Sequence, residues 1–190
     1  MDKHTILIVD DEVGVLNSLK RVLQSEDREI FLAESVDEAE EILKQHGEVE
    51  VIICDNRFSN NILGINFLTK IKRLYPDTIR ILTTAYPDLA TAMEAINKAH
   101  IWRYILKPIE IEELKTLVNQ AFDYYRILKE NRLLLQIARQ QAEWIKILRE
   151  KYPEVVSKEV RESTIYTVDE RRVSEVIAEF MKKYYPQQKK

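Results

Sequence analysis

The chain has 190 residues, of which 45% are hydrophobic and 32% charged, so it can bury one core of ordinary domain size plus a smaller appendage. The formal net charge of −3 argues against a global basic field that would attract nucleic acid or an anionic membrane. The single cysteine excludes an intramolecular disulfide framework and a structural zinc site of the cysteine type. Because we find neither a secretory signal pattern nor the roughly 18 apolar residues of a membrane span, we expect a cytoplasmic protein without a membrane partner.

Short apolar runs alternate with helix-period segments up to residue 108. The predicted strands are 5–9, 30–33, 51–54, 79–83 and 102–106, and the predicted helices between them are 13–25, 36–45, 65–75 and 88–98. Ser35 and Glu38 have the spacing of a capping box at the start of the second helix. Repeats of this kind predict an α/β fold, the flavodoxin-like (βα)5 doubly wound parallel sheet of strand order 2-1-3-4-5.

A different pattern begins at residue 109, because no helix breaker follows until Tyr152 and Pro153. One long helix is the simplest interpretation. A set of residues that are apolar except for Asn131 recurs at alternating steps of three and four, as in a coiled coil: Leu114, Leu117, Ala121, Tyr124, Leu128, Asn131, Leu135, Ala138, Ala142 and Ile145. We therefore divide the chain into an α/β domain (1–125), a coiled-coil helix that continues from the fifth helix (126–152) and a small tail (153–190) with a strand at 163–168 and a helix at 169–185.

Polar side chains follow four of the five predicted strands. In the order 2-1-3-4-5 the strand order reverses between strands 1 and 3, and this reversal brings Asp10 and Asp11 close to Asp55. Three adjacent carboxylates repel unless a cation joins them, and a hard ion with oxygen ligands, Mg²⁺, fits best. Thr84 and Lys107 follow strands 4 and 5 and add a hydroxyl and an ammonium group at the same edge. The set predicts a site for a phosphoryl group.

Each of these residues also has a purely structural explanation. Asp11 or Asp55 alone could form a turn or cap a helix, and Thr84 could cap the helix that follows it. Lys107 before Pro108 could be a solvated strand end that leads into a helix. Independent structural roles would not all converge on one edge of the sheet, so the functional interpretation is favoured.

With the segments "ILIV" before Asp10 and "VIIC" before Asp55, this set resembles a response regulator receiver domain of two-component signalling, over residues 4 to about 125. The resemblance implies that Asp55 accepts a phosphoryl group from a histidine kinase or phosphotransfer protein. It also implies that Asp10, Asp11 and Asp55 hold Mg²⁺ with the backbone carbonyl of Arg57.

The remaining motif residues have roles by the same resemblance. Lys107 pairs with the phosphate, and Thr84 donates its hydroxyl to a phosphate oxygen. Tyr104 is the switch, an aromatic side chain whose rotamer reports the movement of Thr84, although an aromatic residue in a strand also serves packing. The chemistry is sound in itself, because an aspartate is a weak nucleophile that needs metal and lysine to offset the developing charge.

The loop after Asp55 departs from the family pattern. Receivers usually carry Met-Pro at the positions of Phe58 and Ser59 and place the glycine one residue before Gly64. The loop here is longer and lacks the proline. Because it borders the expected metal site, we expect it to influence metal affinity, kinase docking or phosphate lifetime.

No other catalytic motif stands out. The three histidines, His4, His46 and His100, lack metal-ligand spacing, and Cys54 lies in an apolar strand. We therefore expect no enzyme in the ordinary sense, only a phosphoryl acceptor with slow self-hydrolysis.

We expect the chain to pass on its signal through protein contacts. Phosphorylation would rearrange a homodimer joined by the coiled coil, and an unknown downstream protein would bind the rearranged form. Nucleic acid is not the expected partner, because acidic residues offset the basic pairs of the tail. Three alternatives stay open: a transcription regulator, a receiver and linker fragment of a larger effector with DNA-related output, and a structural scaffold with a vestigial receiver.

Overall fold

The computed structural model describes residues 3–59, 62–85 and 99–151. The elements are β1 (His4–Val9), α1 (Val13–Leu23), β2 (Arg28–Ala33), α2 (Val36–His46), β3 (Val51–Asp55), α3 (Gly64–Leu74), β4 (Ile79–Thr84), β5 (Arg103–Leu106) and α5 (Ile111–Lys151). The predicted helix at 88–98 and the predicted elements of the tail lie outside these ranges. The chain divides into two compact units, residues 1–131 and 132–190.

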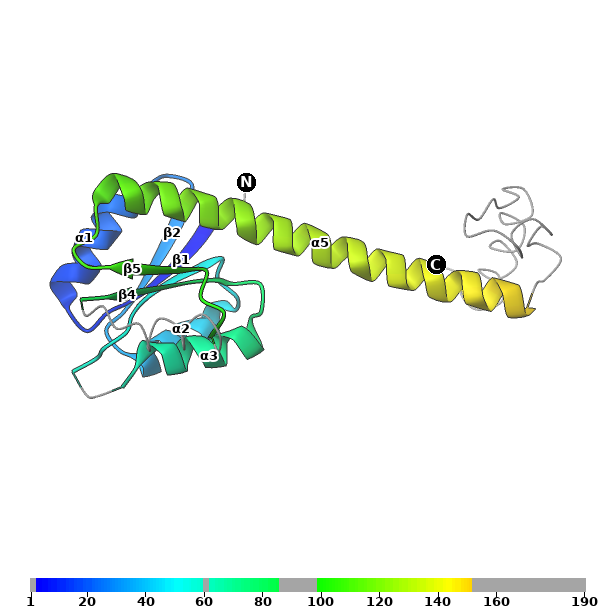
Figure 1. Cartoon of the computed structure of the whole chain (residues 1–190), viewed down its shortest axis with the longest axis horizontal. Helices are drawn as coiled ribbons and strands as arrows, with labels where there is room; N and C mark the ends of the chain where they lie inside the picture. Colours follow the sequence, from blue (N-terminus) through cyan, green and yellow to red (C-terminus); the bar gives the residue numbers. More distant parts are fainter. Residues whose placement is uncertain (1–2, 60–61, 86–98, 152–190) are drawn as a thin grey trace, which may run out of the picture. The chain divides into compact units, whose positions relative to one another are not determined.

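The five strands form one parallel sheet in the order β2-β1-β3-β4-β5, so the predicted fold class is confirmed (Figure 1). The register pairs Asp55, the last residue of β3, with Thr83 of β4. Thr84 in turn pairs with Leu106, the last residue of β5. All carboxyl ends therefore meet at one edge, and the loops that follow β1, β3, β4 and β5 begin side by side.

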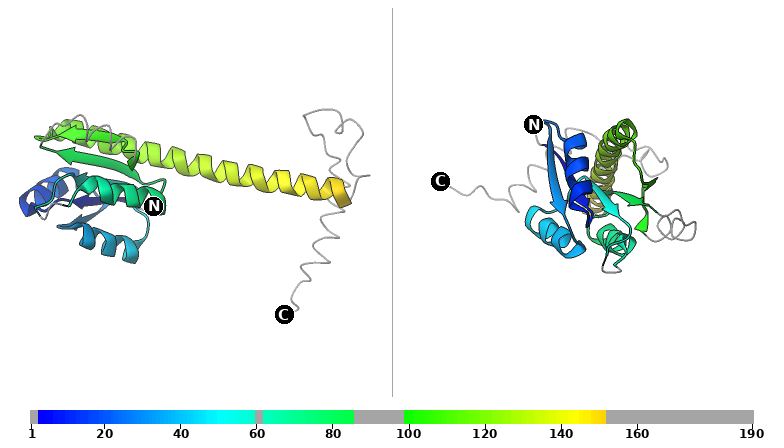
Figure 2. Two further views of the ribbon diagram at one scale, coloured as in Figure 1. Left: turned by 60° about the horizontal axis from the view of Figure 1, so that its bottom comes forward. Right: turned by 90° about the vertical axis from the view of Figure 1, so that its left-hand side faces the viewer.

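Two helical layers cover the sheet (Figure 2). Side chains alternate along each strand, so Ile6 and Ile8 of β1 face α1 and α5, whereas Leu7 and Val9 face α2 and α3. Both faces are apolar, which explains why the strands are continuous hydrophobic runs in the sequence rather than alternating patterns.

The capping signal at α2 is confirmed. The hydroxyl of Ser35 accepts a hydrogen bond from the Glu38 amide at 3.2 Å, and the Glu38 carboxylate accepts one from the Glu34 amide at 2.8 Å. At the other end of α2, Gly47 has a φ of 81°, a left-handed conformation that favours glycine. These local signals fix where α2 starts and stops.

Helix α5 is continuous over 41 residues, as predicted. In the first unit its inner face is buried through Leu114, Val118, Ala121 and Phe122. In the second unit most of the large apolar residues are exposed, some of them beside the predicted seam: Leu133, Leu134, Leu135, Ile137, Trp144 and Ile147. The coiled coil itself stays a prediction. None of the helices in the described part of the chain has the length and apolar character needed to cross a membrane.

Candidate functional site

The centre of the site is the ammonium group of Lys107, which lies between two carboxylates. Its Nζ atom is 2.7 Å from Oδ2 of Asp10 and 2.7 Å from Oδ1 of Asp55. The Asp10 side chain is only 3% exposed and that of Asp55 9% exposed, whereas Lys107 retains 19%. These three residues end or follow β1, β3 and β5, so the strand order brings together three of the residues that the sequence placed at one edge of the sheet.

Backbone amides orient both carboxylates. The Glu12 amide donates to Oδ1 of Asp10 at 3.0 Å, and the Arg57 amide donates to Oδ2 of Asp55 at 2.6 Å. Each carboxylate therefore has one oxygen on a backbone N–H and the other on Lys107. Charge-assisted bonds of this kind hold a carboxylate in one orientation.

The pKa values in this cluster follow from burial and pairing. Burial raises the pKa of Asp10 above its ordinary value, and the hydrogen bond with Lys107 offsets part of that rise. Burial alone would lower the pKa of Lys107, but its hydrogen bonds with Asp10 and Asp55 outweigh this effect and the pKa is raised. Lys107 is therefore a fixed positive charge at neutral pH.

Asp11 lies apart from the lysine pair and is bound by the loop after β3. Its Oδ2 atom accepts a hydrogen bond from the Ser59 amide at 2.7 Å. Hydrogen bonding to Ser59 lowers the pKa of Asp11. No group of three or more His, Cys, Asp or Glu side chains within residues 3–59, 62–85 and 99–151 is arranged to hold a metal ion.

The donor set nevertheless suits Mg²⁺ in its chemistry. Asp10, Asp11 and Asp55 offer carboxylate oxygens, the ligand type that this ion prefers, and Asp10 and Asp55 already converge on one cation, the ammonium of Lys107. The metal role of these residues and of the Arg57 carbonyl stays a prediction.

Thr84 and Tyr104 occupy the places that the sequence suggested. Thr84 is buried as the last residue of β4, and its carbonyl accepts a hydrogen bond from the Lys107 amide at 2.8 Å. Tyr104 in β5 is half-buried and packs against the core that lies under α2 and α3. Their proposed roles as phosphate donor and switch stay predictions.

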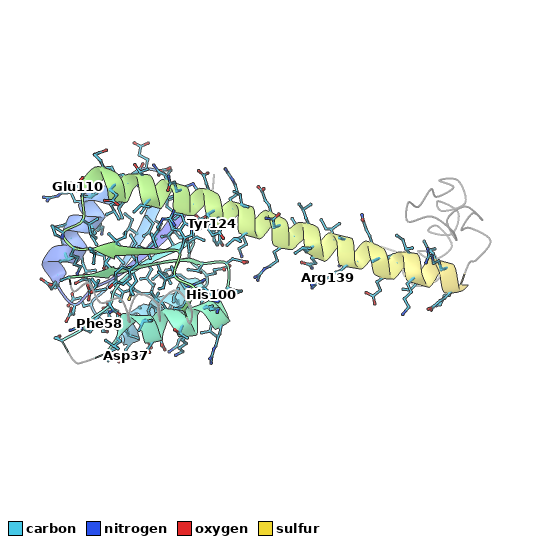
Figure 3. The ribbon with its side chains drawn as sticks, in the orientation of Figure 1. Asp37, Phe58, His100, Glu110, Tyr124 and Arg139 are labelled. Carbon is cyan, nitrogen blue, oxygen red and sulfur yellow. The ribbon has the colours of Figure 1, made fainter. Side chains whose placement is uncertain are left out.

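Three features of the β3–α3 loop were not predicted. Ser59 binds Asp11, and Phe58 is buried in the core. Figure 3 shows where Phe58 lies, in the loop that follows β3. Asn56 is 2% exposed, and its Oδ1 atom has no hydrogen-bond partner among the described residues. A backbone donor leaves no mark in a sequence, but the missing proline at position 59 was a usable signal, because proline has no N–H to donate.

Two cavities lie at the opposite end of the strands. One, of about 440 Å³, is lined by residues that include Arg80, His100 and Tyr124, and the other, of about 360 Å³, by residues that include His4 and Arg28. Figure 3 shows His100 and Tyr124 far from Phe58 and Glu110, which follow β3 and β5. Neither cavity is part of the carboxylate cluster.

A family model identifies the protein family of residues 6–119. The model of the response regulator receiver domain matches residues 6–119, more than half of the chain. This chain belongs to the response regulator receiver family. Receiver domains are signalling domains rather than ordinary enzymes, and they partner with histidine kinases or phosphotransfer proteins.

Relatives of this receiver domain include transcription regulators. It is 37% identical over 127 residues to the hydrogenase transcriptional regulatory protein HoxA of Bradyrhizobium diazoefficiens, an alignment that covers 66% of this chain and 25% of HoxA. It is 30% identical to the DNA-binding transcriptional regulator NtrC of Proteus hauseri, over 68% of this chain and 27% of NtrC. The receiver domain thus spans about a quarter of these relatives.

Solved structures of receiver domains are similar to this chain. The receiver domain of an HD domain-containing protein from Pseudomonas fluorescens has a TM-score of 0.64 at 30% identity, covering 68% of this chain and 94% of that one. The beryllofluoride-activated NtrC4 receiver domain dimer has a TM-score of 0.58 at 30% identity, covering 64% and 98%.

Proposed function

We propose that Asp55 accepts a phosphoryl group from a histidine kinase or phosphotransfer protein in the cytoplasm, at a site that also holds Mg²⁺. The observation that supports this best is the ammonium of Lys107, held 2.7 Å from both Asp10 and Asp55. A positive charge fixed beside the acceptor is what a weak carboxylate nucleophile requires.

In the proposed transfer an Asp55 oxygen bonds to phosphorus while the bond between phosphorus and the donor imidazole breaks, which leaves an acyl phosphate. The Arg57 amide on Oδ2 holds the Asp55 carboxylate in place. Lys107 pairs with the phosphate, and the Thr84 hydroxyl donates to a phosphate oxygen. Asp10, Asp11, Asp55 and the Arg57 carbonyl would hold Mg²⁺, which would supply further positive charge to offset the negative charge of the phosphoryl group.

A matched pair of variants tests this proposal. With acetyl phosphate and Mg²⁺ the wild type should gain one phosphoryl group, and it should bind beryllofluoride. Asp55→Ala should do neither, whereas Asp37→Ala, which removes an exposed carboxylate from the first turn of α2, should behave as the wild type. Labelling that survives Asp55→Ala would contradict the assignment.

We propose further that the signal leaves through α5 in a homodimer. When Thr84 moves toward the phosphate, Tyr104 can turn into the space it leaves and alter the surface at the start of α5. The exposed apolar residues of α5 would be removed from water by a second helix, and burying each methylene is worth about 0.8 kcal/mol. A second copy of this chain is therefore the expected partner.

Sedimentation at micromolar concentration tests the dimer. Leu135 lies in the predicted seam and is 60% exposed, so Leu135→Lys should shift the chain toward monomer. Gln140 is also exposed but lies outside the seam, so Gln140→Lys should not. A wild type that stays monomeric at tens of micromolar would overturn the dimer.

One observation favours the second candidate, a DNA-related output. The relatives HoxA and NtrC are named as transcription regulators, and this chain spans about a quarter of each. The chain would then be the receiver and linker of a regulator that acts on DNA through other parts. Because those other parts would make the DNA contacts, the chain alone should not shift genomic DNA in a gel under either candidate. A shifted band would favour the remaining alternative, a transcription regulator that contacts DNA with residues of this chain.

A further inference from the structure

Asp11 is separated from the other two carboxylates of the site by its hydrogen bond to Ser59. Lys107 joins Asp10 to Asp55, but the Asp11 Oδ2 atom accepts the Ser59 amide at 2.7 Å. Within the described residues, the three carboxylates are not arranged as a group that could hold a metal ion.

The loop fixes the Ser59 amide through its neighbours. The Phe58 side chain is 6% exposed and packs in the core under α2 and α3. The Phe58 amide donates to the Ile62 carbonyl at 3.1 Å, and Arg57 forms an antiparallel bridge with Leu63. Ser59 therefore follows a residue that is anchored on both its side chain and its backbone, and its N–H is held in one place.

We propose that the Ser59 amide competes with Mg²⁺ for the Asp11 carboxylate, so that Ser59 is a positioning residue that weakens metal binding in this chain. The inference rests on the proposed metal site. For Asp11 to join Asp10 and Asp55 around one ion, its hydrogen bond to Ser59 must break or be shared. A proline at position 59 has no N–H and imposes no such competition.

Calorimetric titration of the full chain with MgCl₂ tests the proposal. Ser59→Pro should bind Mg²⁺ about tenfold more tightly than the wild type, the effect expected for losing one hydrogen bond to a charged group. Ser59→Ala keeps the N–H but removes the hydroxyl, whose hydrogen bond also lowers the pKa of Asp11, so it should tighten Mg²⁺ binding less than Ser59→Pro does. Circular dichroism checks that both variants are folded.

A second measurement does not depend on Ser59→Pro folding. In wild-type chain labelled with ¹⁵N-serine, the Ser59 amide signal is identified by its absence from Ser59→Ala. It should start at the low field typical of a bond to a carboxylate and move upfield as Mg²⁺ saturates the site.

The outcomes separate the inference from the proposed function. A Ser59 amide that does not move at saturating Mg²⁺, or a folded Ser59→Pro with wild-type affinity, overturns the competition and leaves the metal site intact. A wild type that binds no Mg²⁺, or binds it equally well after Asp10→Asn, overturns the metal site and the competition with it.

Discussion

Replacing Gly64 with alanine should disturb the site from its backbone. Gly64 is the first residue of α3 and lies so close to β3 that an added Cβ atom would be 2.0 Å from the Asp55 carbonyl oxygen and 2.9 Å from the Cys54 sulfur. The Gly64 amide also donates to the Asn56 carbonyl at 2.9 Å, which holds the helix end against the strand. Neither backbone can move away without breaking this contact.

Gly64→Ala should lower the free energy of unfolding by about 3 kcal/mol, the upper end of the range for overpacked cores. Gly14, near the start of α1, is the matched control, because its added Cβ atom meets nothing within 4 Å. Gly14→Ala should instead stabilise the chain by about 0.5 kcal/mol through helix propensity.

Urea denaturation followed by circular dichroism measures both changes. Gly64→Ala should also weaken beryllofluoride binding, because the atom that must shift belongs to the acceptor residue, whereas Gly14→Ala should leave binding unchanged. If Gly64→Ala unfolds at the same urea concentration as the wild type, the close approach of α3 to β3 is wrong.

Three further variants test other parts of the structure. Ser35→Ala removes the cap of α2 and should cost about 1 kcal/mol in urea denaturation; no loss would contradict the cap. Lys107→Met leaves its two buried carboxylate partners facing each other and should lower the free energy of unfolding by about 3 kcal/mol. MgCl₂ should then raise the unfolding midpoint of Lys107→Met more than that of the wild type. An equal rise would argue against a metal at this place. Hydrogen bonding to Glu48 raises the pKa of Lys129 in the folded chain. The pair therefore stabilises the fold at pH values below the pKa that Lys129 has in the unfolded chain, and this stabilisation is lost as the pH rises through the pKa of the folded chain. Lys129→Met should therefore be less stable than the wild type near neutral pH, and the difference should shrink above pH 10.5; a constant difference would exclude the charge as its cause.

The sheet could be predicted because its signals are local and repeated. Apolar runs of strand length alternate with amphipathic helices, and connection rules leave few strand orders. Strand ends were less accurate: β2 begins at Arg28 rather than at residue 30, and β4 ends at Thr84 rather than at residue 83. Backbone pairing extends a strand into polar residues, and hydrophobicity does not report that pairing.

The residue types of the site could be predicted, but not their pairing. Strand topology alone brings Asp10, Asp55 and Lys107 to one edge. That Lys107 would join two of the carboxylates while Ser59 binds the third depends on backbone amides and on where Phe58 is anchored. Those interactions form only when the loop is folded, so the residue types alone do not predict them.

Exposed apolar residues of α5 also lie beside the predicted seam. The heptad pattern predicts a seam through Leu135 and Ile145, and Leu134, Ile137 and Trp144 are exposed at neighbouring positions. A repeat of three and four selects one line of residues, whereas exposure depends on what packs on the whole helix.

The central claim, that Asp55 is the phosphoryl acceptor, is tested most directly by trapping the acyl phosphate. The full chain is incubated with acetyl phosphate and MgCl₂, reduced with borohydride, digested and sequenced by mass spectrometry. Reduction converts a phosphorylated aspartate to homoserine, so the account predicts homoserine at position 55, with aspartate retained at positions 10 and 11. Homoserine at either of those positions, or at none, would contradict it.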